Sequence, residues 1–347
     1  MQHAGTNDMP LEFADEDALE EYMTRPDSGL VSDLARVPGD IMVLGAGGKM
    51  GPTLARLTRR AAPERRVLAV ARFSDPVARS RLETAGVECL ACDLLDRAAV
   101  ARLPDAPNVV YMAGRKFGST GAEDLTWAMN ALVPAIVAER FASARIVVFS
   151  TGCVYPYVDL RHGGATESTP PRPPPGEYAA SCLARERMFQ YGGRMYGTAG
   201  RLIRLNYAID MRYGVLHDVA RKVRDGVAIR LDAGHVNVIW QGDANARPLC
   251  ALAHVACPAT PLNVSGPETV GIRALAARFG EMFGRAPVFE GTEATTGWLV
   301  DTTESARLFG YPHVPLGRMI DWTARWLEIG GASLEKPTRY DVRSGEF

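Results

Sequence analysis

Residues Ile41-Met42-Val43-Leu44-Gly45-Ala46-Gly47-Gly48-Lys49-Met50-Gly51 place four apolar residues directly before a glycine-rich turn. The apolar run predicts a buried strand, and the stretch near 50–61 predicts a helix directly after the turn. Strand, tight turn and helix in this order let a pyrophosphate approach bare backbone at the positive end of the helix dipole. Gly45-x-x-Gly48-x-x-Gly51 therefore predicts a dinucleotide site, with Gly45, Gly48, Lys49, Met50 and Gly51 among its contacts.

The same pattern continues outward along the chain. Further strands are expected at 67–71, 87–91, 109–112, 146–149 and 202–205, and further helices near 76–85, 122–141 and 178–196. This alternation predicts an α/β fold with a doubly wound parallel sheet. We expect residues 1–39 to form a helical N-terminal extension and residues 40–206 to form the dinucleotide-binding domain. Residues 207–347, with helices near 271–283 and 316–329, should be mainly a smaller substrate lobe with elements that return to the core.

Composition excludes several classes of protein. The 347 residues are 47% hydrophobic with a net charge of -1, which excludes a disordered or collagen-like chain. The balanced charge gives no general attraction for nucleic acid, and no apolar run is long enough to cross a membrane, so we expect a cytoplasmic protein. Cys89-x-x-Cys92 lacks a second ligand pair, and His162, His217 and His235 lack ligand spacing. We therefore expect free thiols and no metal.

The end of the second strand bears on the choice of cofactor. It reads Val70-Ala71-Arg72-Phe73-Ser74-Asp75, with an arginine where an acidic residue would receive the ribose 2′-hydroxyl of NAD. Arginine accepts the 2′-phosphate of NADP instead. Arg72 therefore favours NADP over NAD, although Asp75 lies close enough in sequence to keep NAD open.

Further stretches complete a family pattern: Asp93-Leu94, Tyr111-Met112-Ala113-Gly114, Phe149-Ser150-Thr151-Gly152-Cys153-Val154-Tyr155 and Tyr178-Ala179-Ala180-Ser181. With the glycine turn, they resemble the extended short-chain dehydrogenase/reductase family, the NAD(P)-dependent epimerases and dehydratases, over residues 40 to 330. Other matching positions are Lys116, Asn130, Arg204-Leu205-Asn206, Asp243 and Asp301. The resemblance implies a Rossmann fold. It also implies cofactor contacts from Asp93, Leu94, Ala113, Gly114, Lys116 and Ser150.

The resemblance further implies the catalytic pair. Tyr178 would act as general acid and base, and Thr151 would hold the substrate oxygen. A free phenol has a pKa of about 10, so the family uses a lysine four residues after the tyrosine to favour the phenolate. Cys182 occupies that position here, and Lys116 and Arg185 are the candidates to replace the missing charge. The alternative is a catalytically silent NAD(P)-binding sensor or scaffold.

Two arginines that hold the diphosphate of a nucleotide sugar in family members are also absent. The corresponding runs read Val236-Asn237-Val238 and Thr296-Gly297-Trp298-Leu299-Val300. A buried diphosphate must be paired with charge, so the chain should act on a free sugar, sugar acid or polyol derivative, not a nucleotide sugar. Arg161, Arg212 and Arg230 remain as substitutes. The family also implies a homodimer formed by the helices near 122–141 and 178–196.

Overall fold

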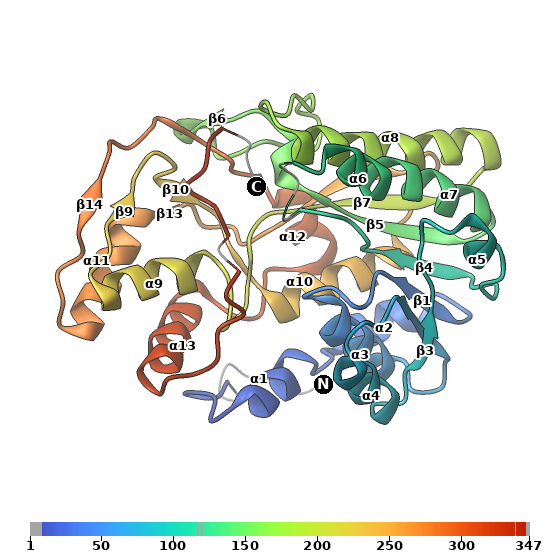
Figure 1. The fold of residues 1–347 in the computed structure, drawn as a ribbon, viewed down its shortest axis with the longest axis horizontal. Coiled ribbons are helices and arrows are strands. Elements are labelled where there is room, and N and C mark those ends of the chain that lie inside the picture. Colours follow the sequence, from blue (N-terminus) through green and yellow to red (C-terminus); the bar gives the residue numbers. More distant parts are fainter. Residues whose placement is uncertain (1–8, 117, 119–120, 337, 345–347) are drawn as a thin grey trace.

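The computed structural model describes residues 9–116, 118, 121–336 and 338–344 and is built on one seven-stranded sheet (Figure 1). The strand order is β12-β7-β5-β4-β1-β2-β3, and all of these strands pair in parallel. Their bounds are β1 Ile41–Leu44, β2 Val67–Ala71, β3 Glu88–Ala91, β4 Asn108–Tyr111, β5 Arg145–Thr151, β7 Gly200–Leu205 and β12 Thr260–Val264. The predicted doubly wound α/β fold is confirmed.

The chain reverses its direction of travel across the sheet at β1. It builds β1, β2 and β3 outward on one side, and then crosses over so that Ile41 of β1 also pairs with Asn108 of β4. Such a reversal leaves a crevice at the carboxyl ends of the two central strands, because the flanking connections diverge there. The glycine turn after β1 and the loop after β4 meet at this crevice.

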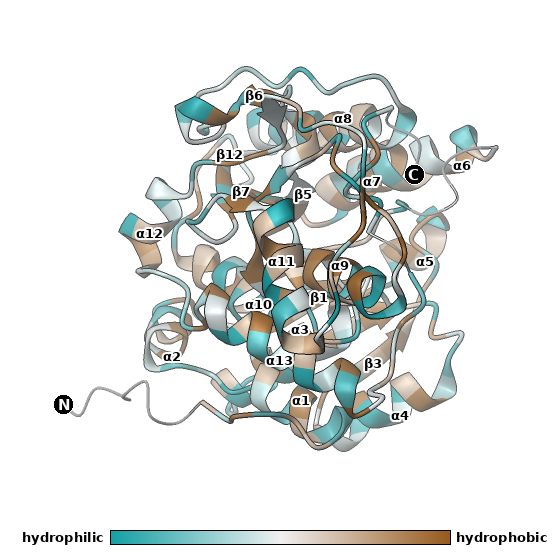
Figure 2. Ribbon diagram, turned by 90° about the vertical axis from the view of Figure 1, so that its left-hand side faces the viewer, coloured by the Kyte–Doolittle hydropathy of each residue, from teal (hydrophilic) through white to brown (hydrophobic). Residues whose placement is uncertain are grey.

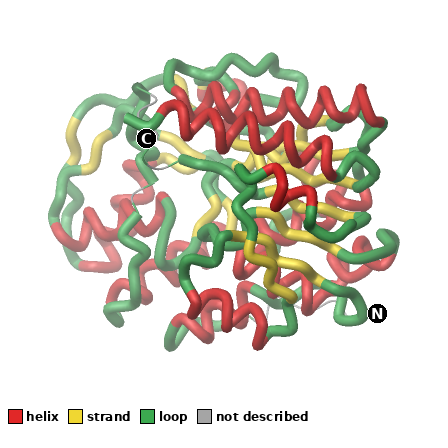
Figure 3. The backbone as a smooth tube through the Cα atoms, turned by 45° about the vertical axis from the view of Figure 1, so that its right-hand side comes forward, coloured by secondary structure: helices red, strands yellow, loops and turns green. Residues whose placement is uncertain are grey.

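Apolar residues concentrate between the layers (Figure 2), and helices cover both faces of the sheet (Figure 3). One buried cluster joins the sheet to α2 Ser28–Ala35, α3 Gly51–Ala61, α4 Pro76–Thr84 and α10 Gln241–Cys250. The cluster on the other face joins it to α5 Arg97–Ala101, α7 Val133–Arg140 and α8 Glu177–Tyr196. The predicted helix near 122–141 is interrupted: α6 Glu123–Trp127 and α7 are joined by a π-helical turn, η2 Ala128–Leu132.

The seventh strand, β12, was not expected. Pro261 lies inside it and Pro258 lies just before it, and proline removes a donor from the hydrogen-bond ladder. The strand is tolerated because β12 lies at the edge of the sheet and pairs only with β7. Because proline is rare in central strands, the two prolines gave no indication that this stretch is an edge strand.

The remaining elements form the lobe and the connections. The larger lobe helices are α9 Val215–Asp225, α11 Ile272–Phe283 and α13 Leu316–Glu328, packed around a core that includes Trp240, Phe279 and Trp322. Short elements are η3 Gly152–Val154, β6 Val158–Asp159, η4 Leu160–His162, β8 Ala208–Ile209, β9 Ile229–Arg230, β10 His235–Val236, β11 Ile239–Trp240, η5 Ala251–Ala253, β13 Val270–Gly271, β14 Phe289–Glu290, β15 Thr296–Gly297 and α12 Thr303–Phe309.

The first helix, α1 Glu16–Met23, lies between the sheet domain and the lobe. Glu20 pairs with Arg56 of α3 at 2.7 Å and with Arg212, just before α9, at 2.9 Å. Phe13 stacks near Trp240 and tilts against Trp322 in the lobe core. The N-terminal segment thus contacts both parts of the fold. None of the described helices is long and apolar enough to span a bilayer.

Candidate active site

The glycine turn has the close packing that a dinucleotide site needs. Gly45 has φ +91°, and a Cβ there would lie 2.5 Å from the backbone nitrogen of Ala113. A Cβ on Gly51 would lie 2.4 Å from the carbonyl oxygen of Ala46. Both positions therefore require glycine, and no side chain caps the N-terminus of α3. The backbone and the helix dipole at this turn suit a pyrophosphate.

A cavity of about 270 Å³ opens beside this turn, along the carboxyl edge of β1, β2, β3 and β4. Seven of the residues predicted to contact the cofactor line it: Gly45, Gly48, Arg72, Asp93, Leu94, Ala113 and Gly114. Met129, from the π-helical turn, also lines it and had no signal in the sequence. The cavity joins residues that are far apart in sequence, as expected for the adenosine half of a dinucleotide site.

Arg72 is exposed at the rim of this cavity and has no ion-pair partner within the described part of the chain. Asp75 instead caps α4, since its carboxylate accepts a hydrogen bond from Val77 N at 2.9 Å. The acidic side chain is therefore engaged locally, whereas the guanidinium is available. The preference for NADP stays a prediction.

Lys49 and Lys116 lie toward the lobe, away from that cavity. Lys49 Nζ is 3.5 Å from the ring centroid of Tyr213, and burial lowers the pKa of Lys49 to about 7. Lys116 Nζ donates to Thr338 O at 3.2 Å and lies 5.9 Å from the ring centroid of Tyr178. The loop after β4 thus places its lysine next to the predicted catalytic tyrosine.

Tyr178 lies in the first turn of α8, partly buried among Cys153, Ala179 and Trp298. Burial raises the pKa of Tyr178 well above its ordinary value, and the thiols of Cys182 and Cys153 raise it further. Thr151 ends β5, and its hydroxyl accepts a hydrogen bond from Cys153 N at 3.2 Å. Strand β5 and the η3 turn that follows Thr151 both contact α8, so the two predicted catalytic residues lie on elements that pack together.

Arg185 supplies a buried cation on the same helix. Its guanidinium donates to Phe149 O at 2.8 Å and to Asn130 Oδ1 at 2.6 Å, and a Cβ on Gly114 would lie 2.2 Å from its Nη2. Its charge opposes the rise in the pKa of Tyr178. Asn130 holds the Arg185 guanidinium in place. Asn130 Oδ1 also accepts from Arg115 N, and Asn130 Nδ2 donates to Arg115 O, both at 2.9 Å.

Ser150 faces the interior of the protein. Its hydroxyl donates to Glu186 Oε1 at 2.6 Å, and Glu186 also receives two hydrogen bonds from Arg204. The carboxylate and guanidinium are 2.7 Å apart and almost fully buried. This pair links β5, β7 and α8 directly below the active site. A cofactor contact from Ser150 stays a prediction.

The regions that lack the expected arginines are occupied by structural hydrogen bonds. Asn237 Nδ2 donates to Val300 O at 2.8 Å, which joins the two regions to each other. The three possible substitutes each have a carboxylate partner: Arg161 with Asp159, Arg212 with Asp210, and Arg230 with Asp232. Two further expected landmarks are also structural, since Asp243 accepts from His313 N at 3.1 Å and Asp301 accepts from Thr303 N at 2.8 Å.

The cysteines of the protein are free thiols. Across the described ranges, no group of three or more His, Cys, Asp or Glu side chains is arranged to hold a metal ion.

Comparisons with known proteins agree with this geometry. UDP-glucose 4-epimerase from Thermotoga maritima, solved with UDP-glucose, superposes with a TM-score of 0.70 at 16% identity, covering 84% of this chain and 99% of that one. A dTDP-glucose 4,6-dehydratase from Streptomyces venezuelae, solved with NAD, gives 0.69 at 20% identity, covering 84% and 97%. UDP-glucuronic acid 4-epimerase from Bacillus cereus, solved with UDP-glucuronic acid and NAD, gives 0.69 at 15% identity, covering 84% and 99%.

These identities are low enough that the structures establish only a shared fold. No curated protein sequence matches this chain. The model of the NAD dependent epimerase/dehydratase family matches residues 41–251, which contain the glycine turn, the cavity beside it, Thr151 and Tyr178. On this match, which spans more than half of its length, the chain belongs to the NAD dependent epimerase/dehydratase family.

Proposed function

We propose that this protein is an NAD(P)-dependent oxidoreductase or epimerase that acts on a free sugar, sugar acid or related hydroxy or keto compound. One observation carries the proposal: the loop that lines the cofactor cavity with Ala113 and Gly114 continues to Lys116, whose ammonium lies 5.9 Å from the ring centroid of Tyr178. A phenol beside a dinucleotide crevice is the arrangement needed to move a hydroxyl proton during redox chemistry at the same carbon.

The cofactor would be held by the glycine turn and by the cavity that Asp93, Leu94 and Arg72 line. When bound, its nicotinamide supplies hydride exchange with a carbinol carbon of the substrate. Tyr178 would take the hydroxyl proton in one direction and return it in the other, with Thr151 orienting the substrate oxygen. Lys49 would add positive charge beside the phosphates.

The missing lysine requires another cation to favour the phenolate. Arg185 is one turn beyond Cys182 on α8, and helix side chains lean toward the N-terminus, which is toward Tyr178. Its buried guanidinium is the cation that opposes the raised pKa of Tyr178. We therefore assign to Arg185, with Lys116, the electrostatic role that lysine has in the family.

The substrate is proposed to be small because the expected diphosphate-binding arginines are absent. Asn237, in the first of the two regions without an arginine, is buried and hydrogen-bonds to Gly266 O and Val300 O. The arginines that could substitute, Arg161, Arg212 and Arg230, each pair with a carboxylate. A diphosphate placed beside Asn237 and Val300 would lack the arginines that pair with it in family members, which is costly for a group taken out of water.

The second candidate function is a catalytically silent NAD(P) sensor or scaffold. The observation in its favour is the environment of Tyr178, where burial and two thiols oppose the phenolate. The test measures NAD(P)H absorbance with a panel of sugars, sugar acids and polyols, for the wild type and for Tyr178→Phe. Turnover that the phenylalanine abolishes supports the enzyme, whereas cofactor binding without turnover on any compound supports the sensor.

A homodimer is also proposed. Exposed apolar side chains gather on the two helices that the family uses for pairing, with Leu125, Trp127 and Leu132 on α6 and η2 and Tyr191, Met195 and Tyr196 on α8. α8 contacts both α6 and η2, so the two groups of apolar side chains lie on neighbouring helices.

A further inference from the structure

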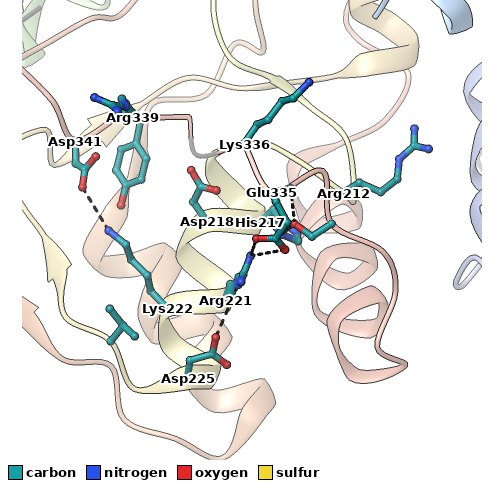
Figure 4. A pocket seen from close by; sticks show the side chains of 13 residues that line it. Arg212, His217, Asp218, Arg221, Lys222, Asp225, Glu335, Lys336, Arg339 and Asp341 are labelled. Carbon is teal, nitrogen blue, oxygen red and sulfur yellow. Dashed lines mark hydrogen bonds and ion pairs between the residues drawn. The ribbon is translucent and has the colours of Figure 1, made fainter. Parts of the chain in front are cut away.

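The C-terminal segment, residues 332–336 and 338–344, follows α13 and lies along α9 (Figure 4). Leu334 N donates to Arg212 O at 3.0 Å. Glu335 pairs with Arg221 at 3.0 Å, and Asp341 pairs with Lys222 at 3.3 Å. These contacts anchor the segment to the lobe.

The middle of the segment contacts Lys116, the lysine beside the predicted catalytic tyrosine. Asp218 of α9 accepts a hydrogen bond from Thr338 N at 2.9 Å, while Thr338 O accepts from Lys116 Nζ at 3.2 Å. The same ammonium lies 5.9 Å from the ring centroid of Tyr178. Thr338 therefore connects the lobe to the sheet domain beside the predicted reaction centre.

The end of the segment covers the other side of that centre. The guanidinium carbon of Arg343 lies 3.7 Å from the ring centroid of Tyr157, and Arg343 Nη1 donates to Thr296 O at 2.8 Å. Tyr157 stacks on Trp298 at 4.6 Å, and Trp298 packs in the cluster that borders Tyr178. From Thr338 to Arg343, the segment therefore lies over the aromatic side chains around Tyr178.

A cavity of about 470 Å³ lies between α9 and this segment, and its charges do not balance. Its carboxylates are engaged: Asp225 and Glu335 face Arg221, Asp341 faces Lys222, and Asp218 holds Thr338. Two further cations that line it, Lys336 and Arg339, are exposed and have no carboxylate within ion-pair distance among the residues described. Five cationic side chains and four carboxylates line this cavity, so its net charge is positive.

The charges of Lys336 and Arg339 also affect the pKa values of Lys49 and Lys116, the two lysines predicted to contact the cofactor. Burial is the main cause of the lowered pKa of Lys49, Asp210 opposes it, and the charges of Lys116 and Lys336 add to it. Burial likewise lowers the pKa of Lys116, and the charge of Arg339 contributes. Lys336 and Arg339 also lie on either side of Thr338, whose carbonyl accepts the hydrogen bond from Lys116.

We infer that the C-terminal segment is the outer wall of the substrate site, and that Lys336 and Arg339 on this wall bind the oxyanion of a compact substrate. The substrate class is a small polyhydroxylated molecule with one carboxylate or one phosphate. On this inference, a nucleotide would enter only if the contacts of Thr338 and Arg343 broke. The inference rests on the proposed function, because it takes the Tyr178 site as the place of reaction.

The competing explanation is that these cations serve the phosphates of the cofactor. The two explanations differ in what a charge-removing variant does. In the substrate role, Lys336→Gln/Arg339→Gln weakens the compact anion and leaves the NAD(P)H dissociation constant within about twofold. In the cofactor role, the cofactor itself is weakened. Arg278→Gln/Arg325→Gln, which removes two exposed arginines from α11 and α13, is the matched control.

The first experiment measures binding by calorimetry to the full chain saturated with NAD(P)H. The probes are D-glucuronate, glucose 6-phosphate, glucose and UDP-glucose at equal ionic strength. We expect one of the two compact anions to bind more tightly than glucose and UDP-glucose. Comparison of D-glucuronate with glucose 6-phosphate then shows whether the protein binds a carboxylate or a phosphate. Lys336→Gln/Arg339→Gln should weaken that anion about tenfold or more, as for the loss of a charge-assisted hydrogen bond. Equal affinity of the variant and the wild type overturns the inference.

The second experiment opens the wall with Arg343→Ala, which removes the contacts with Tyr157 and Thr296. UDP-glucose should then bind more tightly than it binds the wild type, while the compact anion weakens. Wild-type binding of UDP-glucose that matches or exceeds that of both compact anions overturns the inference. Turnover of a compact anion that the Lys336→Gln/Arg339→Gln variant retains in full overturns the inference and leaves the proposed function intact. Charge-dependent binding without turnover supports the binding of an oxyanion by Lys336 and Arg339 and counts against Tyr178 as the place of reaction.

Discussion

Arg185 Nη2 donates a hydrogen bond to Asn130 Oδ1 over 2.6 Å, and Asn130 lies in the π-helical turn between α6 and α7. The side-chain amide of Asn130 points inward from this turn. Its Oδ1 also accepts a hydrogen bond from Arg115 N, and its Nδ2 donates one to Arg115 O. Single π-helical turns inside helices are frequent at functional sites. Here the turn holds a buried cation against the helix of Tyr178, at the place where the family's lysine is missing.

The first prediction concerns this cation. Arg185→Met should move the rising limb of the pH–rate profile to higher pH, because the variant loses the charge that opposes the raised pKa of Tyr178. Turnover at neutral pH should fall in proportion to the fraction of phenolate, which is about tenfold for each unit by which the pKa of Tyr178 rises. Arg185→Lys should retain most of the activity. The measurement is kcat/KM against pH on a substrate found in the panel.

The control for this prediction is Arg187→Met. Arg187 is exposed on the same helix and bonds only to Gln190 among the contacts described. An unchanged pH profile in Arg185→Met, with reduced kcat alone, would assign Arg185 a purely structural role.

The second prediction concerns cofactor choice. Arg72→Ala should weaken NADPH binding roughly 10- to 100-fold, as for the loss of a charge-assisted contact to a phosphate, and should leave NADH unchanged. Dissociation constants for both reduced cofactors can be measured by fluorescence. Arg81→Ala, a neighbouring exposed arginine on α4, is the control. NADH binding more tightly than NADPH to the wild type would refute the assignment of NADP.

The third prediction concerns Lys49. Its pKa of about 7 lies below the ordinary 10.5, so at pH 8 the free protein holds this lysine mostly neutral. A pyrophosphate bound nearby favours the charged form and raises the pKa, so cofactor binding at pH 8 should take up a proton. Calorimetry in two buffers with different ionisation enthalpies measures this uptake. The Lys49→Met variant should bind the cofactor without this proton uptake.

The same lowered pKa has a defined effect on stability. Between about pH 7 and 10.5 the unfolded chain holds the Lys49 proton more tightly than the folded chain does. The contribution of this lysine to the free energy of unfolding therefore rises with pH across that window. Comparison of the wild type with Lys49→Met at several pH values should show the difference in slope.

The sequence predicted six strands of the sheet because each is a short stretch dominated by aliphatic or β-branched residues, although β3 and β7 also contain charged ones. It also predicted the glycine positions, since Gly45 and Gly51 are required by contacts within one βαβ unit. The sequence named Arg185 as a candidate cation, but it did not predict the contact of its guanidinium with Asn130, which lies 55 residues away. The contact between Lys116 and Thr338 spans 222 residues and has no local signal at all.

The fourth prediction concerns the buried pair below the site. Arg204→Met should destabilise the protein by about 3–5 kcal/mol, because Glu186 would remain buried without its partner. The double variant Glu186→Gln/Arg204→Met should be less destabilised than Arg204→Met alone, since no unpaired charge remains. Chemical denaturation measures both. A double variant that is the less stable of the two would contradict the argument.

The fifth prediction concerns assembly. Tyr191 and Met195 in the C-terminal half of α8 are 52% and 57% exposed, so a dimer that buries them removes apolar area from water. Light scattering should find a dimer for the wild type and a monomer for Tyr191→Glu/Met195→Glu, because two charges would be buried without partners. Tyr311→Glu/Ile329→Glu changes side chains that are 72% and 56% exposed elsewhere and should leave the dimer intact. If the control variant dissociates and the α8 variant does not, the interface lies on the lobe, and the helices near Tyr178 are free of contacts between subunits.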